Sequence, residues 1–520
     1  MAEELEKWLV SSNEALNINL VRPTSKSGNL RVFEEPFHPT FTYPIFGEDE
    51  TIFGYIDLEL NLDFRANDLK LSLDIQYEEK WKPIGHTKAM DLKEMLKDYL
   101  PEYVFDAANT SADTIESDVI DSSWKPPGKL LHSYLLHGKQ FEIWSACLAD
   151  PAAKEIFRRM QIFIPFYIEG GTCQNLDDQD WTMERWTLFL VYEVTPLKKL
   201  PGTSPYTIAG FSTSYRLWIF PTLEILRATG SITDTSNGNL TSYTPPQLAT
   251  NPETFRYAEP YNPLSAPSRE RISQFVILPP YQSQSHGTHL YNTMFTLFVS
   301  TPNIYEITVE DPNEAFDDMR DYCDMLYLRT LPAFASLSLP TALPASTLQK
   351  DADIPTDLIL GPEETLTALR RAAKISPRQF ARLVEMHLLS TIPPLHRSTA
   401  RITRKEKSGH ENDRRYYFWR LALKERLYRH NADQLAQMEQ SERIEKVEET
   451  AKGVEADYTR LLEGVEKRAK WAKVQEANGS AAHGGKRKKR VVDEEDEDDD
   501  EDVVGGAREV IAAKRPKVAG

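Results

Sequence analysis

Residues Gln274–Thr288, QFVILPPYQSQSHGT, combine three local signals of structure. An apolar run typical of a buried strand ends at Pro279-Pro280, a pair that lacks backbone donors and therefore ends regular strand pairing. A short polar loop containing Gly287 follows, and a helical pattern begins at once. Strand, loop and helix start together present several backbone N–H groups at the positive end of a helix dipole. The stretch therefore predicts an anion site suited to phosphate or pyrophosphate.

Two common nucleotide-binding motifs do not fit this stretch. A P-loop requires the pattern GxxxxGK[ST], which the sequence lacks. A dinucleotide fingerprint requires three glycines, whereas this loop contains only Gly287.

Strands and helices alternate on both sides of the stretch, from about residue 130 to 335. Apolar runs rich in β-formers predict strands at Trp186–Val194, Thr207–Phe220, Ile272–Leu278 and Ile304–Glu310. Helices are expected over Ala152–Met160, His286–Val299 and Asp311–Tyr322. The alternation favours an α/β core with parallel strand pairing. Residues 228–270 are rich in Ser, Thr, Asn and Pro, which predicts a long flexible insertion.

The flanking regions differ from this core and from each other. Residues 1–125 are predicted to form a small mixed α/β domain, with a strand at Tyr55–Leu62 and a helix at Thr87–Leu100. The core domain then spans 126–340. Residues 341–476 have helical periodicity, at Glu363–Lys374, Pro377–Leu389 and Arg414–Lys473. Residues 477–520 are predicted to be a disordered tail.

The last predicted helix carries a heptad seam. Its apolar residues step by three and four, at Ile444, Val447, Ala451, Val454, Tyr458, Leu461 and Val465. Two interpretations stay open: a long helix packed on its own domain, or a coiled-coil surface for a partner.

Charge is distributed unevenly along the chain. The net charge is −18, of which the last 37 residues carry only −2, although they include the ten consecutive acids Asp493–Asp502. The folded part is therefore acidic, which disfavours nucleic acid as the main partner and suits a cationic one. Basic clusters at Lys486–Arg490 and Lys514–Lys517 predict nuclear import, with the protein expected in both nucleus and cytoplasm.

Composition narrows the class of protein further. Hydrophobic residues make up 40% and charged residues 27%, as in ordinary globular proteins, and no run reaches the length of a membrane span. No secretion signal opens the sequence, and three scattered cysteines suit neither a disulfide framework nor a zinc site. We expect a soluble intracellular protein that contacts no membrane.

The loop fits the coenzyme A motif of the GNAT acetyltransferases, Q/R-x-x-G-x-G/A, as Gln282-x-x-Ser285-x-Gly287. Ser285 replaces the first glycine of the motif, so a positive φ at this position costs more than it does for Gly. Over roughly residues 1 to 390 the chain closely resembles the type B histone acetyltransferases, a family within that superfamily. The matching segments are Phe46–Tyr55, Ile168–Glu169, Gly210–Tyr215, Ser273–Gln282, His286-Gly287 and Ile307–Asp318.

The resemblance implies a fold and a reaction. The fold is an α/β (α+β) arrangement with a GNAT-type central mixed sheet, flanked by helices, between the small N-terminal domain and the helical C-terminal domain. The reaction is acetyl transfer from acetyl-CoA to lysines in the tail of free, newly made histone H4. The family's usual partners are H4 with its histone partner and a WD-repeat histone-binding subunit, and its role lies in histone deposition and chromatin assembly.

The resemblance also implies a cofactor site. Acetyl-pantetheine would pair with the free backbone of the strand Phe275, Val276 and Ile277. Pyrophosphate would bind the loop, at Gln282, Ser283, Gln284, Ser285, His286, Gly287 and Thr288. Asn313 would lie near the pantetheine.

Catalysis requires a base, because a lysine ammonium has an ordinary pKa of about 10.4. Glu310 is the candidate, since it follows a strand at the carboxyl end of the sheet, where α/β sites lie. Glu169 and Asp311 are the family's other acidic candidates. We expect these three carboxylates to cluster and to raise one another's pKa.

Two segments are candidates for histone binding. The acidic loop Glu48, Asp49 and Glu50 would attract a basic tail, and Tyr215, Arg216 and Leu217 lie on the strand that faces the cofactor strand in the family. Because a cation suits a basic peptide poorly, we expect Arg216 to point away or to pair with an acid.

Other functions stay open on the sequence alone. One alternative is a GNAT enzyme that acetylates another amine. A second is a non-catalytic acidic scaffold or chaperone that binds histones. His286 and His289 lack further ligands nearby, so no metal is expected. Cys323 has no local histidine partner, which favours direct transfer in a ternary complex over an acyl-cysteine route.

Overall fold

A computed structural model describes residues 6–23, 29–106, 122–178, 180–196, 198, 203–232, 250–255, 263–349 and 352–482. Residues Met1–Glu466 form one compact unit, and Lys467–Gly520 belong to a second. Most of the predicted insertion, both basic clusters and the acidic run lie outside the described residues. Within the described part of the chain, no helix is long and apolar enough to cross a membrane. The three boundaries between the four domains expected from the sequence stay predictions.

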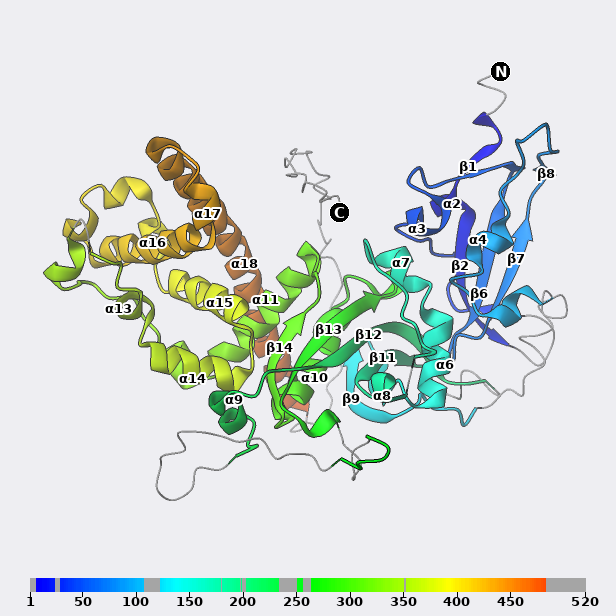
Figure 1. The fold of residues 1–520 in the computed structure, drawn as a ribbon, viewed down its shortest axis with the longest axis horizontal. Coiled ribbons are helices and arrows are strands. Elements are labelled where there is room, and N and C mark those ends of the chain that lie inside the picture. The colour runs from blue at the N-terminus through cyan, green and yellow to red at the C-terminus, as the bar shows by residue number, and fades with distance from the viewer. Residues whose placement is uncertain are drawn as a thin grey trace. The chain divides into compact units, whose positions relative to one another are not determined.

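The N-terminal region is built on a four-stranded sheet, blue in Figure 1, in the order β3-β2-β6-β7. Its strands are β2 (Leu16–Pro23), β3 (Asn29–Arg31), β6 (Glu59–Arg65) and β7 (Leu71–Gln76). Strand pairs β1 (Leu9–Ser11) with β4 (Thr51–Phe53), and β5 (Tyr55–Ile56) with β8 (Glu79–Lys80), accompany it. The predicted strand Tyr55–Leu62 is divided between β5 and β6, because Asp57 takes a left-handed φ of 51°.

The predicted helix Thr87–Leu100 is shorter in the structure. It is α4 (Leu92–Leu96), and it begins where the Asp91 carboxylate accepts a hydrogen bond of 3.3 Å from the N–H of Glu94. The sequence therefore predicted the element but neither its start nor its end.

The central sheet has six strands in the order β14-β13-β12-β11-β10-β9. They are β9 (Lys129–Leu136), β10 (Lys139–Cys147), β11 (Trp186–Val194), β12 (Tyr206–Trp218), β13 (Ser268–Ile277) and β14 (Ile304–Val309). The four strands predicted in this region are all present, so the mixed α/β fold class is confirmed. Their direction is a correction: only β13 and β14 run parallel, and every other neighbouring pair is antiparallel.

Part of the reason for this difference lies in the connections. β9 and β10 are joined by His137 and Gly138, both with positive φ, which is the backbone of a tight antiparallel hairpin. β13 and β14 are joined by a crossover helix, α10 (His286–Ser300), which buries Leu290, Met294 and Phe298 and allows them to run parallel. The length of a connection does not fix the direction by itself, because β10 and β11 are antiparallel although residues 148–185 separate them. Apolar runs therefore predict strands but not their direction.

Further helices accompany the sheet. α6 (Pro151–Met160) begins as predicted, with the Asp150 carboxylate accepting bonds of 2.9 Å from the N–H groups of Ala152 and Ala153. α7 (Phe163–Tyr167), α8 (Asp180–Met183), α9 (Leu223–Ala228), α11 (Glu314–Arg329) and α12 (Pro332–Ala335) complete this region, with the short α2 (Ser12–Ala15) and α3 (Tyr43–Phe46) nearer the N-terminus.

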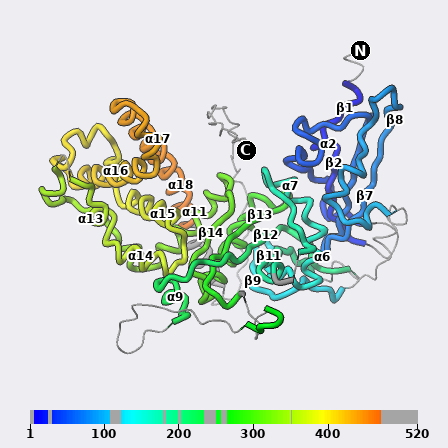
Figure 2. The backbone as a smooth tube through the Cα atoms, in the orientation of Figure 1, coloured from blue at the N-terminus to red at the C-terminus, as the bar shows by residue number. Residues whose placement is uncertain are grey.

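The C-terminal region is helical, yellow to orange in Figure 2. It contains α13 (Thr356–Leu360), α14 (Glu363–Ala373), α15 (Pro377–Ser390), α16 (Glu411–His430), α17 (Ala432–Leu435) and α18 (Gln440–Ala482). The expected long helix Arg414–Lys473 is thus divided into three, with its first break at Asn431, whose side chain donates to the carbonyl of Leu427 at 2.8 Å.

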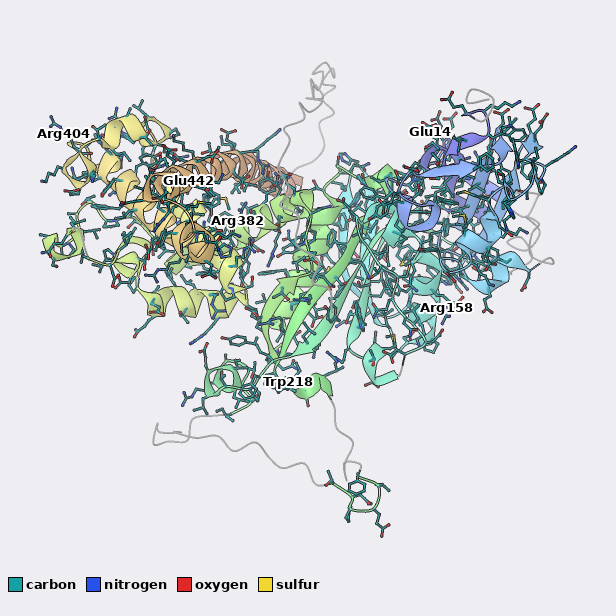
Figure 3. All side chains as sticks on the ribbon, turned by 45° about the horizontal axis from the view of Figure 1, so that its top comes forward. Glu14, Arg158, Trp218, Arg382, Arg404 and Glu442 are labelled. Carbon is teal, nitrogen blue, oxygen red and sulfur yellow. The ribbon has the colours of Figure 1, made fainter. Side chains whose placement is uncertain are left out.

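The heptad seam of α18 packs inside its own unit over most of its length. Ala451, Tyr458, Leu461 and Val465 are fully buried, whereas Ile444 is 62% exposed. Arg382 of α15, labelled in Figure 3, donates 2.8 Å bonds to Asp321 of α11 and Asp457 of α18. The structure therefore supports the first interpretation of the seam, a helix packed on its own domain.

Candidate active site

The edge of β13 that faces β14 is paired over only part of its length. β13 pairs with β12 as far as Ile277, but its pairing with β14 ends at Ile272 opposite Val309. The last bond on that side runs from the N–H of Glu310 to the carbonyl of Ile272, at 2.9 Å. Residues 273–277 thus have no strand partner on the β14 side within the described chain. This edge offers backbone groups to an extended ligand.

The predicted cofactor strand presents two faces at this edge. Ser273, Phe275 and Ile277 are half-buried and share one face, as alternation along a strand requires. Val276 lies on the opposite face and is 3% exposed, so it offers only its backbone to a ligand.

Within the described residues, the start of α10 has backbone N–H groups without acceptors. Its N-cap residue, Ser285, makes no side-chain capping bond, and no acidic residue lies in the first turn. The N–H groups of His286, Gly287 and Thr288 precede the first intrahelical bond, which His289 donates to the carbonyl of Ser285 at 3.2 Å. An uncapped helix start with its positive dipole end is suited to an anion.

The loop before α10 holds two serines in the left-handed region. Ser283 has a φ of 58° and Ser285 a φ of 67°, so the residue that departs from the motif adopts the conformation for which glycine is favoured. Such a conformation costs roughly 1–2 kcal/mol for a residue other than Gly. The side chains of Gln282 and Gln284 donate to the carbonyls of Ile277 and Pro280, at 2.9 and 3.1 Å, and stabilise the loop.

The absence of a side chain at Gly287 allows the first turn of α10 to lie close to Met319 of α11, next to the cofactor strand. A Cβ there would lie 3.0 Å from the Met319 sulfur and 3.6 Å from the ring of Phe275. Phe275 in turn packs edge-on against Phe316 of α11, with ring centroids 5.0 Å apart. Free strand edge, uncapped helix start and missing Cβ together fit a ligand with an extended amide chain and a phosphate group.

Glu310 lies where β14 ends, half-buried beside the free part of β13. The Ser273 hydroxyl donates to one carboxylate oxygen at 2.7 Å, and the Tyr215 hydroxyl lies 3.5 Å from the other. Arg271 donates to the Tyr215 oxygen at 3.4 Å, and this bond, with the nearby Glu310 charge, raises the pKa of Arg271. Trp186 stacks on Tyr215 with centroids 4.4 Å apart. The carboxylate is thus held in place beside an aromatic wall.

The other acidic candidates occupy different positions. Asp311 follows Glu310 directly, is exposed, and has a φ of 35°. Asn313 is the N-cap of α11, and its side-chain oxygen accepts a 2.9 Å bond from the N–H of Phe316. Glu169 is an exposed residue after α7, and no hydrogen bond or ion pair of its side chain occurs within the described residues. The expected cluster of three carboxylates stays a prediction.

Of the three acids in the N-terminal acidic loop, Glu50 has a structural role. Glu50 accepts bonds from the N–H groups of Thr42 at 2.6 Å and Tyr43 at 3.1 Å, and the Thr42 bond contributes most to lowering the pKa of Glu50. The Tyr43 hydroxyl accepts a 2.7 Å bond from the N–H of Gly170. Glu50 is therefore linked, through Tyr43, to the residue that follows Glu169.

Glu48 and Asp49, by contrast, are exposed to solvent. Of the three acids in this loop they are the two whose charge faces outward.

The three residues of β12 predicted to contact the histone do not all lie on the same face of the strand. Tyr215 and Leu217 are half-buried on one face. Arg216 is paired with the buried Glu270, at 3.3 Å, and donates to the carbonyl of Leu264 at 2.9 Å. The expectation that Arg216 pairs with an acid is confirmed.

Three residues of this site were assigned no role from the sequence: Trp186, Arg271 and Ser273. Ser273 had a usable signal, because it precedes Phe275 by two residues and must share its face. Trp186 and Arg271 had none, because they reach Tyr215 through antiparallel pairings that the sequence did not predict.

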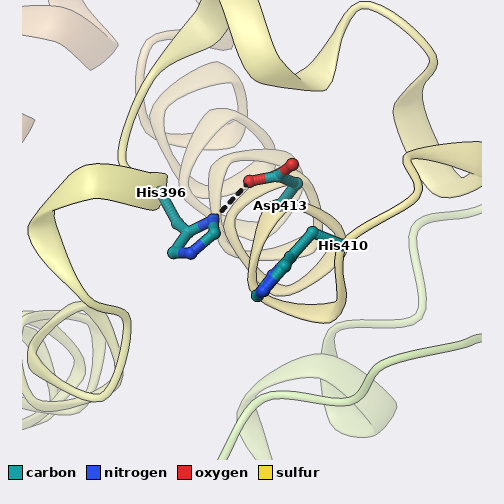
Figure 4. Close-up of side chains that lie close together, drawn as sticks. All are labelled: His396, His410 and Asp413. Carbon is teal, nitrogen blue, oxygen red and sulfur yellow. Dashed lines mark hydrogen bonds and ion pairs between the residues drawn. The ribbon is translucent and has the colours of Figure 1, made fainter.

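Potential metal ligands gather at one place in the described residues, away from this site in the sequence: His396, His410 and Asp413, shown in Figure 4. His396 Nδ1 and Arg401 Nε both bond to Asp413 Oδ1, at 2.7 and 2.9 Å. His410 Nδ1 accepts the N–H of Asn412 at the start of α16. These bonds explain the cluster as a helix cap. The expectation of an enzyme without a metal stays a prediction.

Two family models match the chain. One, described as "Histone acetyl transferase HAT1 N-terminus", matches residues 8–169, and the other, "Fungal HAT1, C-terminal", matches 347–392. A histone acetyltransferase type B catalytic subunit from Aspergillus oryzae is 38% identical over 91% of this chain and 89% of the relative. The one from Gibberella zeae is 37% identical over 90% of this chain and 93% of the relative.

Among solved structures, an aminoglycoside acetyltransferase from a soil metagenome is similar over 39% of this chain and 90% of its own length. Its identity is 13% and its TM-score 0.19, so this likeness carries no argument.

Proposed function

The chain belongs to the family of type B histone acetyltransferase catalytic subunits, and from this premise we propose that it acetylates lysines in the tail of free histone H4. As a member of that family it is an acetyltransferase, with acetyl-CoA as its cosubstrate. The observation that carries the proposal is the free edge of β13, which lies between an uncapped helix start and the carboxylate of Glu310.

Binding of acetyl-CoA uses backbone groups more than side chains in this proposal. The free edge at 273–277 pairs with the amide chain of the pantetheine, as an added strand would. The N–H groups of His286, Gly287 and Thr288 bind the pyrophosphate. Gln282, Ser283, Gln284 and Ser285 shape the loop, and Asn313 fixes the start of α11 beside the pantetheine.

Glu310 acts as the general base. Its carboxylate takes a proton from the lysine ammonium, directly or through one water, so that the neutral amine attacks the thioester carbonyl. A C–N bond forms and the C–S bond breaks in one ternary complex, without an acyl-enzyme; coenzyme A leaves as the thiolate, which takes up the second proton that the amine loses. Ser273 and Tyr215 orient the carboxylate, and the stacked Trp186 and Tyr215 border the path of the lysine side chain. Glu169 and Asp311 add negative charge for a cationic substrate.

The partners follow from charge and from the family. The exposed Glu48 and Asp49 attract the basic H4 tail and increase its rate of encounter, while Tyr215 and Leu217 contact it. We further propose a WD-repeat subunit as the partner that holds the rest of the histone, with H4 bound to its own histone partner. The basic clusters at Lys486–Arg490 and Lys514–Lys517 direct part of the protein to the nucleus, where it serves chromatin assembly.

The test is acetyl transfer from labelled acetyl-CoA to free H4, to nucleosomes and to small amines. Wild-type protein is expected to acetylate free H4 preferentially. Glu310→Gln should lower kcat on the order of 100-fold while leaving the Kd for acetyl-CoA unchanged, because the base acts on the amine and not on the cofactor. Glu314→Gln, an exposed acid in the first turn of α11, is the matched control.

Three outcomes distinguish the competing functions. Faster transfer to small amines or to a protein N-terminus would favour an enzyme for another amine. Histone binding without transfer by wild type, with cofactor bound, would favour an acidic scaffold. Full activity of Glu310→Gln would remove Glu310 from the role of base while leaving the family assignment intact.

A further inference from the structure

The ring of His286 is buried and makes one hydrogen bond. His286 is the first residue of α10, directly after the two left-handed serines, and its side chain is 1% exposed. Its Nδ1 shares a 2.8 Å hydrogen bond with the hydroxyl of Tyr134, on the edge strand β9. Its other nitrogen, Nε2, is buried and has no hydrogen-bond partner within the described chain. The Tyr134 hydroxyl is thus the one polar group here that satisfies the ring.

Aromatic contacts hold the same two residues together. The His286 ring lies 4.3 Å from that of Phe141, centroid to centroid, and Tyr134 stacks at 3.9 Å on His289, one turn further along α10. His289 in turn faces His132 at 6.1 Å. The first turn of α10 is therefore joined to β9 and β10 by a ring stack and by a single polar bond.

Both histidines on α10 are neutral at ordinary pH. Burial lowers the pKa of His286 to about 4 and that of His289 to about 4, with smaller effects from neighbouring basic groups. The groups that face His286 are His137, Lys139 and His289, together with Tyr134 and Tyr281, and none of them is an acid. A neutral ring at a helix start leaves the backbone amides as the donors for an anion.

The loop before His286 requires support from outside. Ser283 and Ser285 are held with positive φ, and backbone of this kind persists only where its surroundings determine it. Gln282 and Gln284 supply that support at the start of the loop. At the end of the loop, the His286 side chain is buried in the protein interior.

We propose that Tyr134, through its hydrogen bond to His286, is a positioning residue for acetyl-CoA, which keeps the amides of the α10 start in the geometry that binds pyrophosphate. The proposal rests on the proposed function of that loop. A phenyl group at position 134 would leave both nitrogens of the buried His286 imidazole without a hydrogen-bond partner. The ring would then turn toward water and move the loop with it, while the stack on His289 would stay.

The experiment compares wild type, Tyr134→Phe and the control Tyr206→Phe. Tyr206 is also a buried tyrosine of the central sheet, and its hydroxyl bonds to Glu142 at 3.2 Å, not to the loop. The Kd for acetyl-CoA is measured by calorimetry, and KM and kcat by transfer to an H4 peptide. Tyr134→Phe is expected to raise Kd and KM for acetyl-CoA about tenfold, with kcat at saturation changed less than about twofold. Tyr206→Phe should change neither Kd nor KM.

A double-mutant cycle with Ser285→Gly separates positioning from general destabilisation. Because Gly accepts the left-handed backbone without cost, the loop needs less support, and the effect of Tyr134→Phe on Kd should shrink to about threefold or less in that background. A merely structural role would give the same factor in both backgrounds. Hydrogen exchange at His286, Gly287 and Thr288 should be faster in Tyr134→Phe.

The outcomes are distinct. If wild type does not bind acetyl-CoA, the proposed function fails. If wild type binds it and Tyr134→Phe binds it within a factor of about two, this inference is overturned and the proposed function stands. His286→Asn, which loses the ring contact with Phe141, should raise Kd in the same direction and replaces Tyr134→Phe if that variant does not fold.

Discussion

The first turns of helices α10 and α11 both lie against the ring of Phe275, yet they are built differently. At α11 the Asn313 side chain caps the helix with a 2.9 Å bond, and Glu314 and Asp317 supply negative charge to the first turn. At α10 there is neither a capping bond nor an acid, and the N-cap residue Ser285 is left-handed.

The first turn of α11 is built for helix stability, whereas that of α10 keeps its N–H groups available for a ligand. Capping by Asn and acids in the first turn are the ordinary ways to stabilise a helix, each contributing typically ~1 kcal/mol or less. The chain uses them at α11 and omits them at α10, where the amides keep their capacity to bind an anion. The lack of these features does not by itself mark a site, since α15 also begins without a capping bond or an acid, but at α10 it coincides with the free edge of β13.

The largest predicted effect comes from giving α10 the acid that α11 already has. Thr288→Glu places a carboxylate in the first turn, where it competes for the amides and repels pyrophosphate. Acetyl-CoA affinity should fall at least about tenfold, while the free energy of unfolding should rise by ~0.3–1 kcal/mol. Calorimetry with acetyl-CoA measures the loss of affinity, and thermal unfolding without acetyl-CoA measures the gain in stability.

The matched control is Thr296→Glu, the same change at an exposed position in the middle of α10. It adds equal charge away from the helix start and should alter affinity by less than about twofold at physiological salt. Equal losses of affinity in both variants would mean that net charge, and not the helix start, determines binding.

A smaller effect is expected from removing the cap of α11. Asn313→Ala should lower the free energy of unfolding by ~1 kcal/mol, because the N–H of Phe316 loses its acceptor. Its effect on the Kd for acetyl-CoA should be smaller than that of Thr288→Glu. Denaturant unfolding and cofactor titration measure both. A loss of affinity greater than that of Thr288→Glu would show that α11 binds the ligand as directly as α10 does.

The sequence predicted the parts of this site that depend on neighbouring residues. The apolar run, Pro279-Pro280 and the polar loop with Gly287 are local signals, so the end of β13, the loop and α10 were expected close to their actual bounds. The predicted start of β13 was wrong: the strand begins at Ser268 and not at Ile272, so its first residues lie in the stretch 228–270 that was predicted to be a flexible insertion. Glu310 at the end of β14 followed from the same alternation of strands and helices.

What the sequence could not predict depends on pairing across the sheet. Most of the central strands are antiparallel, and only β9 and β10 owe this to the hairpin at His137 and Gly138. Apolar periodicity carries no information on direction. The stack of Trp186 on Tyr215 follows from that pairing. The internal bonds of Glu50 likewise depend on Thr42 and Tyr43 in the folded chain, so an acidic loop and a structural carboxylate had the same appearance in sequence.

The smallest effect concerns Ser285, the residue that departs from the coenzyme A motif. Because Ser285 already adopts a φ of 67°, Ser285→Gly should relieve strain without moving the amides. We expect the free energy of unfolding to rise by ~0.5–1 kcal/mol and the Kd for acetyl-CoA to change less than about twofold. Ser283, with a φ of 58°, is the matched position, and Ser283→Gly should act in the same direction. Chemical denaturation of the two single variants and of the double variant measures whether the gains add. If both substitutions destabilise the protein, the serine side chains themselves hold the loop. The start of α10 would then be stabilised by these side chains, in place of the cap that α11 has.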